Sequence, residues 1–555
     1  MTAINTSRRR FLQQSALAAA MVNFPSVLLA GTGGLKRAAT PGFNPDLEIE
    51  FIAQTAQIPI LANGPTTRVQ KFSATLLKGP QQALQQLPGN YLGPILNFQQ
   101  GQKVRIFFKN SLNEASIIHW HGLHVPQHSD GHPMYSIEPG QQFVYEFEVL
   151  NRAGTSFYHS HSHNLTAEQV YRGLAGLITV SDGDEQKLDL PSGEFDLPLV
   201  IQDRSFNEQN QLQYVHKMHD RMQGFLGDTI LVNGKPNAEF RVKSRAYRFR
   251  AANGSNSRIY KLGWDDGTPL TVIGTDACLL GKPETRPYIM LAPGERVDLW
   301  LDFSGRAVAD KLVMYSLPFS GTLPGMAENM QKRGGMGMMH HALPQGGKFA
   351  IATFSVTEKV NDSPKLPETL VPFQRLTLQD VDNSDSPLPI AISMQPMRPL
   401  VNGKSFAMDK VMDFERVALG SIKRIRIFHD HEMHGGGMGM MKGMRHRNAQ
   451  HEADDSSSGN KMGMGGMMMD MAHPIHLHGQ QYQILRRVTD KVRSTDYAGV
   501  KDGFVDSGWK DTVLVMPGEE VEIIKPFQDY KGLFLYHCHN LEHEDFGMMR
   551  QFLVE

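Results

Sequence analysis

Cysteine is scarce in this sequence, since its 555 residues include only Cys278 and Cys538. A chain with so few cysteines cannot hold its fold together with a disulfide framework. Net charge is also nearly absent, because 56 Lys and Arg residues balance 57 Asp and Glu residues. Without an excess of positive charge, the chain lacks the field that attracts nucleic acid, so we expect no nucleic-acid partner.

Long apolar runs are missing as well. The apolar stretch near the N-terminus follows paired arginines and is interrupted by Gln13, Gln14, Asn23 and Pro25. It is too short and too polar to remain in a bilayer, so we expect no stable membrane insertion. The segment SRRRFL at residues 7–12 matches a twin-arginine (Tat) export signal, which predicts passage through the Tat translocase to the periplasm. A basic disordered tail is the alternative.

Histidine, by contrast, is abundant, with 23 residues. Random placement would give about one His-x-His pair, which would more often be a surface or packed histidine than a ligand. The chain contains six such pairs. On an extended segment, residues two apart point to the same face, so each pair presents two imidazoles together. The excess of pairs predicts metal binding.

The run His-Cys-His at residues 537–539, followed by His543 and Met548, predicts a blue copper site joined to further metal ligands. A thiolate, two histidines and a weak axial methionine form a trigonal copper site suited to electron transfer, and His473 can supply the second histidine. On a strand, Cys538 points to one face and its two histidine neighbours to the other. A short covalent path therefore connects the copper at Cys538 with metals across the strand.

Four strings resemble the copper signatures of the multicopper oxidases, the family that includes laccases, ascorbate oxidase and bacterial cuprous oxidases. They are HWHGLHVP, GTSFYHSH, HPIHLHG and HCHNLEHEDFGMM, and the resemblance extends from about residue 45 to residue 555. It is strongest to the periplasmic copper-resistance oxidases, on the basis of HEDFGMM, GWKDTV and a methionine-rich insertion. The resemblance implies an oxidase that couples one-electron oxidation of a substrate to the four-electron reduction of O2 to water.

The resemblance also implies four copper ions: one type 1, one type 2 and two type 3. The type 1 ligands would be His473, Cys538, His543 and Met548, and the type 2 ligands His119 and His476. One type 3 copper would take His121, His159 and His539, and the other His161, His478 and His537. In the string HSHSH, His163 is an alternative to His159, but the preceding GTSFY favours His159.

Ligands of the implied cluster come from both ends of the chain. Four of the eight lie in residues 119–161 and four in residues 476–539, so the two ends must meet around a metal staple. Two carboxylates, Asp130 and Glu544, match positions that related oxidases use for dioxygen reduction and proton relay; ordinary surface carboxylates are the alternative. His124, His128 and His132 follow in the first loop, where we expect them to be solvated or to support metal ligands.

Three internal repeats predict three domains. The strings GQKVRIFFKNSL, KSRAYRFRAANGS and GSIKRIRIFHDH each precede a Pro-Gly turn and an alternating strand, clearest at Phe143, Tyr145, Phe147 and Val149. Regular turns and short alternating strands indicate antiparallel sandwiches, and the resemblance implies the cupredoxin type. We therefore expect an all-β fold of three consecutive cupredoxin-like Greek-key β-sandwich domains. Their predicted extents are 41–185, 186–370 and 371–555, after a signal peptide and spacer at 1–40.

The middle domain has no His-x-His pair, so we expect it to act as a spacer and scaffold. The third domain carries an insertion at residues 429–472 with eleven methionines. Its glycine, serine and charge predict disorder until a ligand binds, and soft thioethers favour Cu(I). Because the insertion leads into His473, we expect additional labile copper beside the type 1 site; a loop without a catalytic role is the alternative. Candidate ligands of a substrate copper are Met471, Asp470, Met394 and Met397.

These observations favour a periplasmic, monomeric cuprous oxidase that also oxidises phenols. A general laccase or a ferroxidase, with phenols or Fe(II) as substrates, is a second possibility. A copper-buffering protein, in which the methionine-rich segment does the biological work, is a third.

Overall fold

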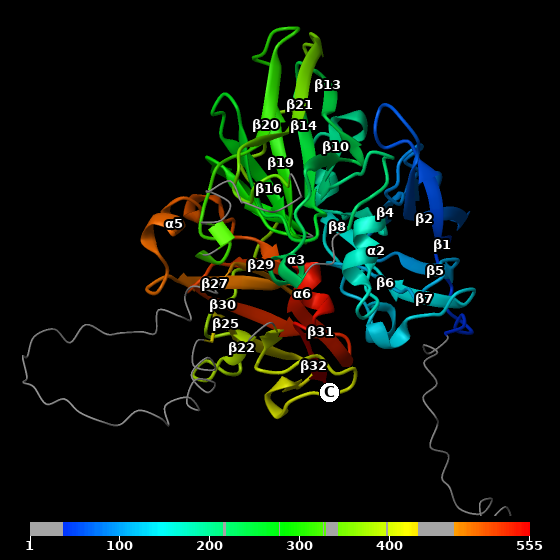
Figure 1. The fold of residues 1–555 in the computed structure, drawn as a ribbon, viewed down its shortest axis with the longest axis vertical. Helices are drawn as coiled ribbons and strands as arrows, with labels where there is room; N and C mark the ends of the chain where they lie inside the picture. Colours follow the sequence, from blue (N-terminus) through cyan, green and yellow to red (C-terminus); the bar gives the residue numbers. More distant parts are fainter. Residues whose placement is uncertain are drawn as a thin grey trace, which may run out of the picture.

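The structure is a computed structural model that describes residues 37–214, 218–276, 278–325, 327–328, 342–395, 398–430 and 471–555. Its strands form six sheets, which confirms the predicted all-β fold. The sheets group in pairs along the chain, as a first, a middle and a third sandwich (Figure 1). The boundaries predicted at 185 and 370 fall in connections between strands of successive sandwiches and remain predictions.

One sheet of each sandwich repeats the same four-strand order. In the first sandwich the order is β2 (Thr67–Lys78), β1 (Leu47–Ile58), β5 (Lys103–Asn110) and β7 (Gln142–Glu148). In the middle sandwich it is β11 (Thr229–Val232), β10 (Asp196–Arg204), β14 (Ala246–Asn253) and β19 (Arg296–Asp302). In the third it is β23 (Arg398–Val401), β22 (Leu388–Gln395), β25 (Ser421–His429) and β30 (Glu520–Phe527). The sequence repeats are thus the last two strands of each order, which pair antiparallel.

The two larger of these sheets carry extra strands. The middle one adds β12 (Lys235–Pro236) at one end and β16 (Leu270–Thr275) and β17 (Cys278–Arg286) at the other. The third adds β27 (Tyr482–Val488) and β28 (Trp509–Lys510). A short helix, α5 (Ser494–Ala498), follows β27.

The second sheet of each sandwich also repeats one topology. In the first sandwich its order is β3 (Leu84–Gln85), β4 (Ile95–Gln99), β9 (Ala175–Ser181), β8 (Gly154–Ser160) and β6 (Ile118–His119). In the middle it is β13 (Ala238–Lys243), β21 (Phe349–Glu358), β20 (Lys311–Ser316), β15 (Tyr260–Trp264) and β18 (Ile289–Leu291). In the third it is β24 (Arg416–Val417), β32 (Met549–Val554), β31 (Gly532–Cys538), β26 (His473–Leu477) and β29 (Thr512–Val515). The histidine motifs lie on or next to strands of the first and third of these sheets.

Each sandwich encloses its own apolar core. In the first, the predicted alternation of β7 is confirmed, since Phe143, Tyr145 and Phe147 are buried in one cluster with Val149. Burial of a phenylalanine side chain contributes roughly 1.5–3 kcal/mol, so this face alone fixes the register of the strand. Cys278 is buried at the start of β17, as expected for a small apolar residue.

Three short helices lie where the sandwiches meet (Figure 1). They are α2 (Thr166–Arg172), α3 (Met218–Gln223) and α6 (Leu541–Asp545), and α6 contacts both of the others. The carboxylate of Asp545 accepts hydrogen bonds from the backbone N–H groups of Thr166 and Ala167, at 3.1 and 2.9 Å. These contacts fasten the C-terminal end of the chain to the first sandwich.

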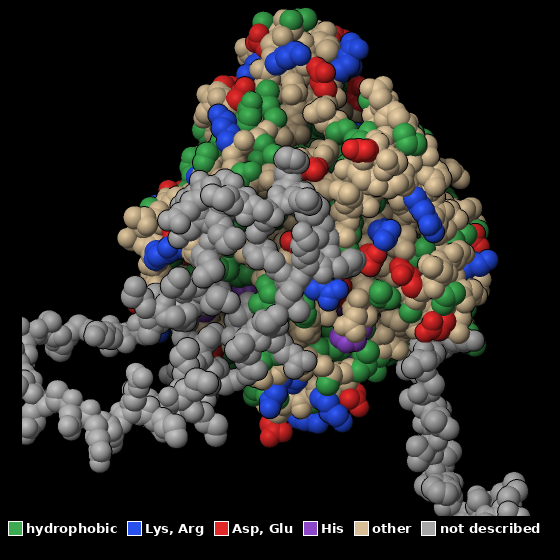
Figure 2. Space-filling model, viewed as in Figure 1, with side chains coloured by type: hydrophobic (Ala, Val, Ile, Leu, Met, Phe, Trp, Pro, Cys, Tyr) green, Lys and Arg blue, Asp and Glu red, His purple; other side chains and the backbone are tan. Residues whose placement is uncertain are grey.

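The surface carries both signs of charge. Figure 2 shows acidic and basic side chains interspersed over one face, without a large area of either sign. Among the described residues, none of the helices has the length and apolar character needed to cross a bilayer.

Candidate metal centre

Strand pairing sets the histidine motifs side by side. β6 pairs antiparallel with β8, which places His119 opposite His159 in the first sandwich. In the third sandwich, β26 pairs with β31, which places His476 opposite His537. The ladder hydrogen bonds within each sheet therefore fix the relative positions of the histidines in that half of the site.

The two halves meet in one buried cluster. The Nε2 atoms of His119 and His476 are 3.4 Å apart, although the residues are separated by 357 positions. The ring of His119 stacks on that of His478, and the ring of His121 on that of His476, both with centroids 3.7 Å apart. The ends of the chain are thus joined through histidine side chains, as the motif positions predict.

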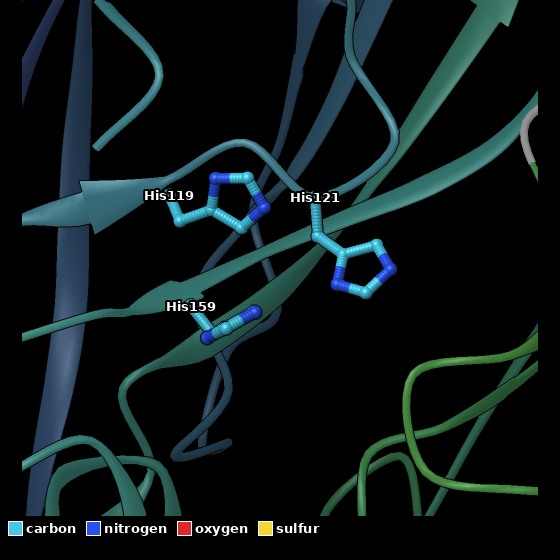
Figure 3. A group of neighbouring side chains, drawn as sticks. All are labelled: His119, His121 and His159. Carbon is cyan, nitrogen blue, oxygen red and sulfur yellow. The ribbon is translucent and has the colours of Figure 1, made fainter. Parts of the chain in front are cut away.

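Three histidines of the first sandwich direct their rings toward a common space (Figure 3). These are His119, His121 and His159, and their ligand nitrogens lie within 4.8 Å of one another. His119 ends β6, His121 lies in the turn that follows, and His159 lies in β8. All three are buried. Their spacing suits imidazole coordination of metal ions in one cluster.

A second group combines both sandwiches. The Nε2 atom of His537 is 3.4 Å from Nε2 of His161 and 3.2 Å from Nε2 of His478. The three nitrogens point at one another. A proton on one of them can be shared with only one neighbour, so lone pairs on the other nitrogens still face each other and repel. A cation between them removes that repulsion.

Unpaired nitrogens provide a direct test of whether the site fits a metal. Within the described part of the chain, His121 Nδ1, His159 Nε2 and His539 Nε2 are buried and have no hydrogen-bond partner. Each unsatisfied buried group costs about 1–3 kcal/mol. A coordinated metal would satisfy all of them, so the residues present fit a metal cluster.

In several of the cluster rings, the Nδ1 atom makes a hydrogen bond. His119 Nδ1 donates to the backbone carbonyl of Asp130 at 2.6 Å, and His476 Nδ1 to that of Asp511 at 2.9 Å. His478 Nδ1 is hydrogen-bonded to Oδ2 of Asp130 at 2.7 Å. Because a backbone carbonyl has no proton to give, the imidazoles of His119 and His476 must carry their protons on Nδ1. The Nε2 lone pair then faces the cluster, as a metal ligand requires.

Burial also keeps these rings uncharged. Loss of solvent lowers the pKa of His159 to about 4 and that of His161 to about 3. It lowers the pKa of His119 well below the usual value, and the neighbouring histidines lower it further. Neutral imidazole is the form that binds metal, so the cluster is ready for coordination at neutral pH.

A smaller site lies on the other face of β31. Sγ of Cys538 is 3.4 Å from Nδ1 of His473 and 3.7 Å from Nδ1 of His543, and all three side chains are buried. The backbone N–H of Cys538 donates to the carbonyl of Met548, whose side chain is buried in the same core. His543 Nε2 donates to the carbonyl of Met222 in α3, which leaves Nδ1 as the ligand atom. The structure thus brings the predicted Cys, two His and Met together.

Burial raises the pKa of the Cys538 thiol. The thiolate is therefore costly at this position unless a cation binds it. Copper would supply that cation, and the neutral imidazoles of His473 and His543 would complete its soft donor set.

Asp130 and Glu544 both line the histidine cluster. Asp130 follows a short 3-10 helix (residues 127–129), and its carboxylate contacts His478, as described above. In α6, Glu544 Oε2 lies 3.1 Å from Nδ1 of His537, and Oε1 lies 3.6 Å from Nε2 of His161. Both carboxylates are almost fully buried, so the alternative of ordinary surface acids is wrong.

The two carboxylates have opposite pKa shifts. Burial raises the pKa of Asp130 well above its usual value. Burial alone would also raise the pKa of Glu544, but the facing imidazoles of His161 and His537 reverse the shift, and the pKa of Glu544 is lowered. Asp130 is thus disposed to hold a proton, and Glu544 is disposed to remain ionised.

The loop histidines lie outside the cluster. His163, the alternative to His159, packs against the ring of Phe406 with centroids 5.2 Å apart. A solvated position is wrong for His124 and His132, which are buried; they contact Asp529 at 3.0 Å and Gln551 at 2.8 Å, both in the third sandwich. These two therefore help to join the sandwiches. His128 is partly exposed.

The candidate ligands of a substrate copper are only partly described. Met471 is buried against Leu323 of the middle sandwich, and its carbonyl accepts a hydrogen bond from His429 Nε2 at 3.1 Å. Asp470, Met397 and residues 431–470 of the insertion lie outside the described residues. Met394 lies in β22, and its side chain is not among those described.

Asp511 is a site residue that the sequence reasoning left without a role. Its Oδ1 accepts a hydrogen bond from His121 Nε2 at 2.9 Å, and its backbone carbonyl binds His476. It lies in the string GWKDTV, which marks the resemblance described above. The presence of an acid in a string that already marks the resemblance was the available signal.

Three β-sandwiches with a buried Cys-His site and a histidine cluster shared between the first and third define a cupredoxin-type metalloprotein. Family models for multicopper oxidases match residues 68–185 and 462–555. A multicopper oxidase of Staphylococcus aureus is 29% identical over 489 residues, covering 88% of each chain. A laccase of Bacillus subtilis is 28% identical over 521 residues, covering 88% of this chain and 87% of its own.

Solved structures agree. The multicopper oxidase McoA of Aquifex aeolicus has a TM-score of 0.70 and 29% identity, with coverage of 92% of this chain and 97% of its own. These matches support a laccase-like member of the multicopper oxidase family. The protein is accordingly a copper-dependent oxidoreductase.

Proposed function

We propose that the protein is a periplasmic cuprous oxidase that oxidises Cu(I), with phenols as side substrates, and reduces O2 to water. The observation that carries the proposal is the end of strand β31, where Cys538 faces one buried donor set while His537 and the residue after the strand, His539, face the other. Cys538 is separated from His537 on one side and from His539 on the other by a single peptide unit. Such a path suits transfer of single electrons.

We assign four copper ions to these donors. The type 1 ion takes His473, Cys538, His543 and Met548, and the type 2 ion takes His119 and His476. The type 3 ions take His121, His159 and His539, and His161, His478 and His537. The unpaired nitrogens of His121, His159 and His539, on rings whose centroids lie 4.9–5.7 Å apart, support one of these sets.

When bound, the coppers accept electrons singly from the donor and deliver four of them to O2. The chain provides the route and the protons. Cys538 connects the donor side to His537 and His539, while burial of the cluster excludes bulk water. Asp130 holds a proton next to His478, and Glu544 accepts or passes one next to His537, within hydrogen-bond reach.

Cu(I) is the proposed donor because the methionine-rich insertion is tethered to the type 1 site. The insertion enters through His429, whose ring lies 5.6 Å from that of His473, and leaves through Met471. Thioethers bind Cu(I) in preference to harder ions. The Tat-like segment at residues 7–12 supports the periplasm as the site of action. A laccase or ferroxidase function is the second candidate, favoured by the Bacillus subtilis laccase relative.

Deleting residues 433–469 tests the substrate. We expect Cu(I) oxidation to fall several-fold while oxidation of a small phenol holds or rises, because the deletion removes the thioethers but leaves the buried type 1 ligands in place. Oxygen consumption with each donor measures the two rates. A matched control keeps the length of the insertion and replaces its methionines by serine; it should behave like the deletion.

Other outcomes would exclude the proposal. Equal rates before and after deletion would give the insertion no catalytic role and leave the laccase or ferroxidase. Retained turnover with a large loss of Cu(I) binding capacity would favour copper buffering.

Removal of copper should lower the thermal stability. The ions would bind only the folded chain, where residues 119–161 and 476–539 meet. Ligands of this kind stabilise the fold by about 4 kcal/mol when their free concentration is about 1,000 times the dissociation constant. We expect Tm to fall after chelation and to return when copper is restored, as measured by calorimetry. An unchanged Tm would show that the two ends are held together without the metal.

A further inference from the structure

The middle sandwich reaches the histidine cluster through the turn between β18 and β19. Gly294 in this turn has φ of +84°, a conformation that favours glycine. A Cβ atom at this position would lie 2.9 Å from ring atoms of His539 and 3.1 Å from Cε1 of His121. The backbone of the turn therefore packs directly against both rings.

Arg296, two residues further, makes a bidentate contact with Asp511. Its Nη1 donates to Oδ1 at 2.7 Å and its Nη2 to Oδ2 at 2.6 Å, and both side chains are buried. Arg296 also donates to the carbonyls of Gly294, at 2.8 Å, and Thr155, at 3.2 Å. One guanidinium thus joins all three sandwiches.

The backbone of Asp511 is fixed from the same side. Oδ2 of Asp276 accepts hydrogen bonds from the N–H groups of Asp511 and Thr512, each at 3.2 Å. The ammonium of Lys510 lies 3.0 Å from Asp276 and 3.1 Å from Glu295. The position and the carboxylate plane of Asp511 are therefore set by residues of the middle sandwich.

We propose that Arg296 and Gly294 are positioning residues for one type 3 copper. Arg296 orients Asp511, and Oδ1 of Asp511 accepts a hydrogen bond from the Nε2–H group of His121. This contact leaves the Nδ1 lone pair of His121 for the metal. Gly294 allows the turn to lie against His539, which holds the second ring in place. A planar guanidinium fixes a carboxylate in a way that a lysine cannot. The inference rests on the proposed copper assignment.

The test compares the copper-loaded full-length variants R296Q and R296K with the parent. Loss of the bidentate contact should weaken copper retention against a chelator by about 10–100-fold. It should also reduce the near-ultraviolet absorption of the coupled copper pair and produce a new copper signal in electron paramagnetic resonance. The blue absorption of the type 1 site should be unchanged. R296K should show a smaller effect than R296Q.

Arg258→Lys is the matched control. Arg258 is also fully buried in the middle sandwich and paired with an aspartate, Asp203, at 2.7 Å, but its other hydrogen bonds go to the backbone carbonyls of Gly227, Leu343 and Pro344. R258K should lower Tm without changing the near-ultraviolet band. If the spectra of R296K match those of R258K, Arg296 has only a structural role and the inference is wrong.

If R296Q fails to fold, Gly294→Ala provides a second test of the inference. Its methyl group would press on His539 and His121, so the same type 3 signature should be lost while the blue colour remains. A normal near-ultraviolet band in G294A would contradict the inference. The parent distinguishes the two proposals: a parent without four coppers or a coupled pair refutes the proposed function, whereas an intact parent with unaffected variants refutes only the positioning role.

Discussion

Serine in place of Cys538 abolishes the blue colour and reduces dioxygen consumption to the level of copper-free protein with every donor; this is the largest effect that we expect. The thiolate is the only soft anionic ligand of the donor set, and a serine hydroxyl stays protonated and binds copper weakly. The substitution also removes the sulfur that starts the path to His537 and His539. Visible absorption and an oxygen electrode measure the two losses.

The fold should survive this substitution. Serine is close to cysteine in size, and the neighbours of Cys538 in β31 remain paired with β26 and β32. Cluster copper should therefore be retained, with about three ions left of the four that we propose. Cys278→Ser is the control, because Cys278 is the other buried cysteine and lies in the middle sandwich. A C538S protein that is still blue, or that consumes O2 at the parent rate, would contradict the assignment.

The sequence predicts the fold well because its signals are local and repeated. Each pair of repeats becomes two neighbouring antiparallel strands, such as β5 with β7 and β14 with β19. Alternation along β7 specifies which face is buried, and that face alone determines the register. The His-x-His motifs are local in the same sense, because strand geometry presents both rings on one side.

Contacts between distant residues were not predictable in this way. Asp511 binds His121 across 390 positions, and Arg296 binds Asp511 across 215. Arginine next to a Pro-Gly turn carries no pattern that points to a metal cluster. The middle domain was expected to act as a spacer and scaffold, and the contact of its turn at Gly294 with two cluster histidines is a detail that this expectation did not contain. Nothing in the absence of His-x-His pairs reveals such a contact.

The pKa shifts of the acids depend on neighbours in the same way. Sequence alone leaves open whether burial or nearby charge dominates at Asp130 and Glu544. In the folded chain, Asp130 mainly experiences burial, while Glu544 faces the imidazoles of His161 and His537. Their environments differ because the two acids approach the cluster from different sandwiches.

Glu544→Gln should reduce turnover by about 100-fold while leaving the protein blue. Glutamine has nearly the shape of glutamate and can still contact His537 Nδ1, where the carboxylate lies at 3.1 Å. It cannot accept and release a proton at neutral pH. Reduction of the type 1 site by the donor should therefore keep its rate, whereas reoxidation by O2 should slow, and rapid-mixing absorption spectroscopy separates the two steps.

Asp545→Asn is the matched control for this substitution. Asp545 is the next residue in α6, and its carboxylate binds the backbone of Thr166 and Ala167, so the change should lower stability and spare reoxidation. A D545N protein as slow as E544Q would mean that the position of α6, and not the Glu544 carboxylate, limits the reaction. A loss of blue colour in E544Q would lead to the same conclusion, because His543, a proposed type 1 ligand, precedes Glu544 in α6 and depends on the position of that helix.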